Sequence, residues 1–103
     1  MTKPYTEEKF QKHGTDRVYT IRTFSVDVDE DELVWHRDHD NRVVSVLEGI
    51  DWKLQNDDEL PILLEVGKKY NITEGHYHRL LKGKTKLVIR IEEDFQPSNK
   101  SII

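Results

Sequence analysis

Histidines and carboxylates that could bind a metal lie in two short segments of this chain. In the first, His36 and Asp38 are two residues apart, and residues two apart on a β-strand project to the same side. His39 follows directly in turn-like sequence, where a bend would bring it inward instead of Asp38. The second segment ends at His78. Two imidazoles and a carboxylate suit Fe(II), Mn(II), Ni(II) or Zn(II), and they leave coordination positions open for a ligand.

Two other histidines are poorer candidates for metal binding. His76 could share a face with His78, but it follows Gly75 in a turn and is expected to be exposed. His13 stands alone in a polar segment and is expected to be in solvent. The candidate metal ligands are therefore His36, Asp38, His39 and His78.

Short apolar runs separated by turn residues follow one another from residue 17 onward. Several of them alternate polar and apolar residues with a period of two, as a half-buried strand does. About eight such runs at roughly ten-residue spacing are typical of a sandwich or barrel. No segment with helical periodicity lies between them, which disfavours a parallel sheet with crossover helices. The expected strands are residues 17–28, 33–37, 43–48, 50–55, 62–66, 70–72, 77–81 and 87–91.

The length of 103 residues is sufficient for one domain. Residues 1–16 are polar and broken by proline and glycine, so we expect an N-terminal arm there, with a helical turn at residues 7–12. Residues 17–93 are expected to form the β-barrel. Residues 94–103 read as a flexible C-terminal tail.

Composition narrows the class of function. The formal net charge is −4, and acidic and basic residues are interleaved, so no basic stripe is available for nucleic acid. Cysteine is absent, which excludes disulfides and thiolate chemistry. The chain begins without an apolar signal core and has no apolar run of membrane-spanning length. We expect a cytoplasmic protein that binds neither nucleic acid nor a membrane.

The second segment also has a distinctive spacing of glycines. Gly67, Gly75 and His78 follow the order glycine, five residues, proline, one residue, glycine, two residues, histidine, with Thr73 in place of the proline. This order resembles the second signature motif of the cupin superfamily. Cupins are small β-barrels that hold a metal or a small ligand between two such motifs.

The first cupin motif is altered in this chain. Counting back from Gly49 places Arg42 at the motif's glutamate, His36 at its first histidine and Asp38 at its second. The resemblance therefore implies a barrel interior in which half of the usual metal cage is changed. Arg42 either pairs with Asp38 and closes a metal-free pocket, or it anchors an anionic ligand such as a carboxylate or phosphate.

The resemblance covers about residues 33–91 and is closest to very short single-domain cupins, some of them encoded by phages. It implies an all-β, cupin-type jelly-roll of about eight short antiparallel strands, with His78 entering the pocket from a strand next to His36. It also implies a homodimer, since short cupins commonly pair sheets between subunits. A phage-encoded chain would work in the host cytoplasm.

Two functions follow from these residues. The first is a small cupin whose polar pocket binds a divalent transition metal and a small, anionic molecule, with Arg42 as the ligand-binding residue. The alternative is a metal-free, non-catalytic cupin that acts as a binding or interaction protein. The sequence assigns no reaction, no substrate and no catalytic residue.

Overall fold

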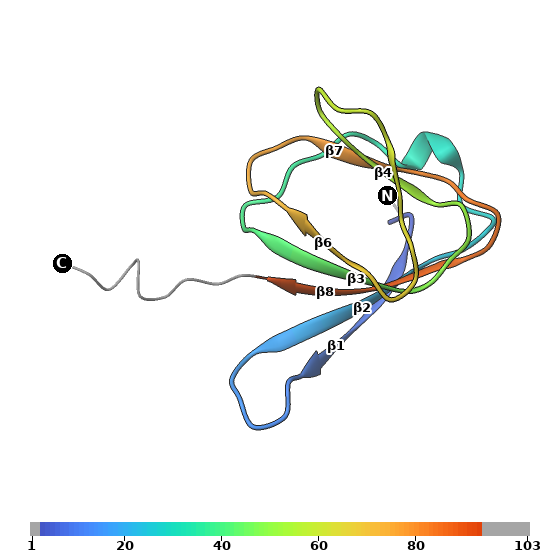
Figure 1. Cartoon of the computed structure of the whole chain (residues 1–103). Helices are drawn as coiled ribbons and strands as arrows, with labels where there is room; N and C mark the ends of the chain where they lie inside the picture. The colour runs from blue at the N-terminus through green and yellow to red at the C-terminus, as the bar shows by residue number, and fades with distance from the viewer. Residues whose placement is uncertain (1–2, 94–103) are drawn as a thin grey trace.

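The computed structural model describes residues 3–93, and these form an all-β structure (Figure 1). Five strands make one sheet in the order β1-β2-β8-β3-β6, and three make a second sheet in the order β5-β4-β7. All pairings are antiparallel. The elements are β1 (Thr6–Gln11), β2 (Val18–Phe24), the 3₁₀ helix η1 (Glu30–Glu32), β3 (Arg42–Glu48), β4 (Lys53–Asn56), β5 (Ile62–Leu63), β6 (Lys69–Ile72), β7 (His78–Leu81) and β8 (Leu87–Glu93).

The two sheets form a sandwich, and the core consists of side chains that face the space between them. In β8 the cause is alternation, since Leu87, Ile89 and Ile91 are buried while the residues between them are more exposed. This strand lies at the centre of the larger sheet, between β2 and β3. The core residues are Phe24, Val28, Leu33, Val44, Val46, Trp52, Leu54, Leu64, Ile72, Leu87, Ile89 and Ile91.

The prediction of an all-β sandwich of about eight antiparallel strands is confirmed. The sandwich is not closed into a barrel, because no ladder joins the two sheets between residues 3 and 93. Figure 1 shows the β1–β2 hairpin extending away from β4 and β7.

The helical turn predicted for residues 7–12 was wrong. This part of the N-terminal arm forms β1, which pairs with β2 along its whole length. Side chains find partners across this pairing. Glu7 lies 2.9 Å from Arg22, and the Phe10 ring stacks on Tyr19 at 5.4 Å between centroids. Such cross-strand pairs stabilise a strand that local composition alone does not predict.

The strand predicted for residues 33–37 was also wrong. The acidic residues before it form η1, whose cap Asp29 accepts a hydrogen bond from the backbone N–H of Asp31 (2.9 Å). The loop that follows makes a single bridge, between His36 and His78. One bridge is enough to position His36, although it does not extend into a strand.

The other predicted strands overlap β2 to β8, with ends that differ by several residues. The predicted tail, residues 94–103, lies outside the described residues. Within residues 3–93 no helix is long and apolar enough to cross a membrane. The homodimer stays a prediction.

Candidate metal centre

Two histidines from distant parts of the chain are held side by side by backbone hydrogen bonds. His36 lies in the loop after η1, and His78 opens β7. The N–H of His36 donates to the carbonyl of His78 (2.9 Å), and the N–H of His78 donates to the carbonyl of His36 (2.8 Å). The ring centroids are 4.3 Å apart, with 65° between the ring planes. This reciprocal pairing fixes the positions of both imidazoles.

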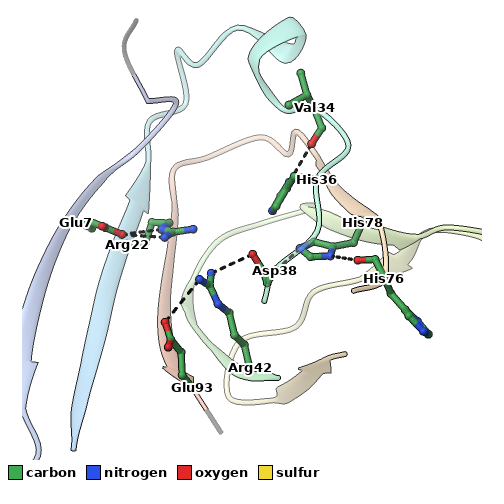
Figure 2. A network of polar contacts seen from close by, with 9 residues as sticks. All are labelled: Glu7, Arg22, Val34, His36, Asp38, Arg42, His76, His78 and Glu93. Atoms are coloured by element: carbon green, nitrogen blue, oxygen red, sulfur yellow. Dashed lines mark hydrogen bonds and ion pairs between the residues drawn. The ribbon is translucent and has the colours of Figure 1, made fainter. Parts of the chain in front are cut away.

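Asp38 completes a group of three possible ligands. Its carbonyl accepts a hydrogen bond from the N–H of Gly75 (2.8 Å), which ties its loop to the turn before β7. Gly75 has a φ of +76°, which glycine adopts without strain. The Asp38 side chain is 9% exposed, and its Oδ2 lies 3.4 Å from His78 Nε2. One ligand atom from each of His36, Asp38 and His78 lies within 4.8 Å of the others (Figure 2).

The hydrogen bonds of the two rings decide which nitrogen is free to bind a metal. Nδ1 of His36 lies 3.0 Å from the carbonyl oxygen of Val34, and Nδ1 of His78 lies 3.0 Å from that of His76. A carbonyl oxygen only accepts, so Nδ1 carries the proton in each neutral ring and Nε2 keeps its lone pair. Metal-binding histidines are commonly oriented by such a hydrogen bond.

One oxygen of the Asp38 carboxylate, Oδ2, faces the lone pair of His78 Nε2 instead of a hydrogen-bond donor. This oxygen is buried and has no hydrogen-bond partner among residues 3–93. The neighbouring His78 Nε2, at 3.4 Å, is an acceptor in the neutral ring. Two acceptors this close repel each other unless a proton or a metal ion binds with them. The ligand atoms of His36, Asp38 and His78 therefore suit a divalent metal.

Burial lowers the pKa of His78 below its usual value, and the neighbouring His36 and Arg42 act in the same direction. The hydrogen bond to the His76 carbonyl and the Asp38 carboxylate oppose this shift of the pKa. Because the net shift is downward, the His78 imidazole is neutral at pH 7. A proton on His78 is thus an unfavourable way to satisfy Asp38 at this pH.

Arg42 opens β3 and points toward Asp38 (Figure 2). Its Nη1 lies 3.6 Å from Asp38 Oδ1, and its Nη2 lies 3.6 Å from Glu93 Oε1. These are ion-pair contacts, too long for good hydrogen bonds. The Nε of Arg42 is buried and has no partner in the described part of the chain. The ion pair between Arg42 and Asp38 that the sequence suggested is therefore present. At this distance it is not a good hydrogen bond for the guanidinium N–H groups.

The three possible ligands line a cavity with two parts. The inner part has a volume of about 50 Å³ and mostly apolar walls. The outer part has a volume of about 280 Å³ and is bounded by η1, the loop after it and the segment before β1. His36, Asp38, Arg22 and Arg42 line both parts, and His78 lines the inner part. Polar side chains thus lie between an apolar inner space and the more polar outer space.

Arg22 is a cavity residue that the sequence reasoning missed. It lies on β2, on the same face as the buried Thr20 and Phe24. The alternation of residues along β2 could have identified Arg22, because a charged side chain on the buried face of a strand is unusual. The Arg22 side chain is 16% exposed.

His39 lies outside the group of possible ligands. It is exposed, whereas Asp38 takes the inward position that strand parity predicted. His76 is exposed as well. The structure thus brings together His36, Asp38 and His78, with Arg42 beside them. Metal binding by these residues stays a prediction.

No family model matches the sequence, and no curated protein matches it. Solved structures do match in fold. An RmlC-like cupin with a double-stranded β-helix fold from Methanocaldococcus jannaschii aligns with a TM-score of 0.68 and 12% identity over 98% of this chain and 89% of that one. A chain from a structure of the DMSP lyases RdDddP and RnDddQII aligns with a TM-score of 0.71 and 12% identity over 86% of this chain and 46% of that one.

A third structure is cobalt(II) HppE in complex with substrate, with a TM-score of 0.64 and 17% identity over 86% of this chain and 51% of that one. The chain therefore spans about half the length of the lyase and HppE chains that it resembles. At these identities the similarity establishes the fold. It does not assign the activity of any of these proteins to this chain. The chain is a small protein with the cupin fold.

Proposed function

We propose that this chain binds a divalent transition metal through His36, Asp38 and His78, beside a cavity that admits a small molecule. The observation that carries the proposal is the convergence of three acceptors with no donor among them. Both Nε2 atoms keep lone pairs because Nδ1 of each ring faces a carbonyl oxygen. The Asp38 Oδ2 is buried without a hydrogen-bond partner between residues 3 and 93.

Preorganisation supports the proposal. The two histidines are fixed by reciprocal backbone hydrogen bonds, and Asp38 is fixed by its hydrogen bond from Gly75. The ligand atoms therefore need little rearrangement before a metal binds. The similarity in fold to cobalt(II) HppE is consistent with metal binding by a protein of this shape.

Two imidazoles and one carboxylate leave coordination positions open, and a metal held this way supplies a Lewis acid or a site for oxygen chemistry. The chain's own residues would shape what reaches those positions. The apolar walls of the inner cavity exclude water from one side. Arg42 places a positive charge where many cupins have a carboxylate, so an anionic molecule would be favoured beside the metal.

Arg42 also opposes metal binding. Two unit positive charges about 5 Å apart repel by roughly 3 kcal/mol at an effective dielectric of about 20. The carboxylates of Asp38 and Glu93, each 3.6 Å from the Arg42 guanidinium, offset part of this repulsion. We therefore expect weaker metal binding than in a cupin with the usual glutamate, and tighter binding once an anion has neutralised Arg42.

Cobalt(II) titration of protein prepared without a chelator or a histidine tag tests the proposal. We expect one equivalent of metal to bind, with visible absorption bands of a site that contains nitrogen ligands. His78→Ala should abolish these bands, whereas His76→Ala and His39→Ala should leave them nearly unchanged because neither side chain belongs to the group of converging ligand atoms. A folded parent protein that binds no Co(II), Zn(II), Mn(II) or Fe(II) would refute the proposal.

The ion pair between Arg42 and Asp38 supports the alternative, a metal-free pocket in a binding or interaction protein. In that case Arg42, instead of a metal, balances the Asp38 charge. The same titration separates the two functions, because only the alternative predicts a folded protein without metal affinity.

A further inference from the structure

Two arginines from different strands line both parts of the cavity, together with two of the proposed metal ligands. Arg22 comes from β2 and Arg42 from β3, and β8 lies between these strands. Figure 2 shows the Arg22 guanidinium directed from β2 toward the space that Arg42 and Asp38 face. Arginines that reach into an enclosed space are candidates for binding an anion.

Arg22 is held in one orientation with part of its guanidinium unused. Its Nε donates a hydrogen bond to Glu7 Oε1 (3.0 Å), and its Nη2 lies 2.9 Å from the same oxygen in an ion pair. The ring of Tyr5 stacks on the guanidinium, with 3.8 Å from Cζ to the ring centroid. These contacts of Arg22 with Glu7 and Tyr5 do not use Nη1. A guanidinium held in this way needs little reordering to bind a carboxylate.

Arg42 is less satisfied still. Its guanidinium reaches two carboxylates at 3.6 Å, and its Nε has no hydrogen-bond partner within residues 3–93. Its Nε is buried. Buried donors without acceptors are unfavourable, and an incoming carboxylate or phosphate would supply the acceptors.

The charges around the cavity suggest the order of binding. The carboxylates around the two guanidiniums are those of Glu7, Glu32, Asp38 and Glu93. Without a metal the carboxylates outnumber the guanidiniums, so an added anion is repelled. A divalent cation at His36, Asp38 and His78 removes this excess of negative charge. The anion should therefore bind after the metal.

We propose that Arg22 and Arg42 form an anion subsite that takes the carboxylate of a small organic acid whose other end reaches the metal. The proposal rests on the proposed metal centre and adds Arg22, the ligand class and the binding order. The planar guanidinium matches a carboxylate. The outer cavity, about 280 Å³, is just below the usual range for drug-sized ligands, and the inner walls are mostly apolar. The acid is therefore compact, with an uncharged body.

The test compares two probes that differ in one charge, 3-mercaptopropionate and 3-mercaptopropionamide. Each thiolate binds to Co(II) and gives a charge-transfer band, so the band measures binding of either probe to the cobalt-loaded protein. We expect the parent protein to bind the carboxylate at least tenfold more tightly than the amide. Arg22→Met and Arg42→Met should each reduce this preference to about twofold or less. Arg22→Lys, which keeps the charge but loses the planar fork, should retain an intermediate preference.

Arg90→Met is the matched control. Arg90 also lies over a tyrosine ring, 3.9 Å from the Tyr19 centroid, and its Nε lies 3.4 Å from Glu92 Oε1. It alternates on β8 with the buried Ile89 and Ile91, so it faces away from the cavity. We expect the tenfold preference to survive in this variant. Loss of preference in Arg90→Met, or its survival in a folded Arg22→Met protein, would overturn the subsite.

The two proposals fail in different ways. A parent protein that binds Co(II) but shows no preference for the carboxylate refutes the subsite and leaves the metal centre intact. A parent protein that binds no Co(II) refutes the metal centre and, with it, the subsite, because the anion is proposed to bind only after the metal.

Discussion

Interior polar groups are hydrogen-bonded at one end of the sandwich and lack hydrogen-bond partners at the other. β3 runs from Arg42 at one end to Glu48 at the other. Near the Glu48 end, Trp52 is fully buried and its Nε1 donates to the carbonyl of Thr85 at 2.6 Å. At the other end, the Oδ2 of Asp38 and the Nε of Arg42 are buried without hydrogen-bond partners between residues 3 and 93. The tryptophan end satisfies its interior polar group within the fold, and the Asp38 end leaves buried polar groups without partners, as our proposed ligand site requires.

Side chains and backbone around Trp52 are tightly packed. A Cβ on Gly83 would collide with the carbonyl oxygen of Ile50 and with Trp52. A Cβ on Gly49 would lie 2.8 Å from a methyl group of Leu87, which is itself fully buried. Tight packing here fixes one end of β3 and of β7, and the opposite ends of these strands carry Arg42 and His78.

Trp52→Ala should have the largest effect on stability. It removes the largest fully buried side chain and a short hydrogen bond, so we expect a loss of about 3–5 kcal/mol in the free energy of unfolding. Urea denaturation of the metal-free protein measures this loss. His76→Ala, at an exposed position, is the control and should change the free energy of unfolding by less than about 0.5 kcal/mol. A loss of under about 1 kcal/mol in Trp52→Ala would remove the distinction between the two ends.

Asp38→Asn should have the largest effect on metal binding. The change keeps the shape of the side chain and removes the negative charge that faces the two Nε2 atoms. Loss of an outer-shell partner costs 10- to 100-fold in metal affinity, so loss of a ligand should cost about 100-fold or more. Competition with a metal indicator measures the affinity, and His39→Asn is the control at the neighbouring exposed position. Equal losses in the two variants would mean that the third ligand was assigned wrongly.

Arg42→Glu should tighten metal binding by about tenfold, or about 1.4 kcal/mol. It removes a repelling cation and restores the carboxylate that the first cupin motif normally has. The variant also loses the ion pairs with Asp38 and Glu93, so its stability should fall even as its metal affinity rises. Metal titration beside the parent protein, with circular dichroism to verify the fold, gives the answer. Unchanged or weaker metal affinity would show that residue 42 is not at the motif's glutamate position.

Much of this arrangement could be predicted from the sequence, because strand alternation and glycine spacing are local signals. Parity placed His36 and Asp38 on one side, and the spacing from Gly67 through Gly75 placed His78 at the start of a strand. The choice between Asp38 and His39 could not be made. It depends on the hydrogen bond from Gly75 to Asp38, a contact between residues far apart in the sequence.

Tertiary contacts also explain what was missed. β1 has few apolar residues, so composition suggested a loose arm, but its pairing with β2 brings Glu7 to Arg22. That ion pair orients Arg22 in the cavity. The loop with His36 lacks a strand because its preceding acidic residues form η1. For β1 a partner distant in the chain outweighs local preference, and before His36 a short local helix takes the place of the expected strand.

The smallest expected effect is a pH dependence of stability that arises at the Asp38 end. Burial holds the pKa of folded His78 below its usual value of about 6.5. In metal-free protein, the unfolded chain therefore binds more protons than the folded chain as the pH falls below about 6.5, and stability is lost as the pH falls toward the folded pKa. His78→Gln removes this group, so its stability should depend less on pH between 7.5 and 5.5.

Urea denaturation of both proteins at these two pH values measures the difference. The His76→Gln variant, altered at an exposed ring, should behave like the parent. If parent and His78→Gln lost the same stability on acidification, the pKa of His78 would not be lowered by burial in the folded protein.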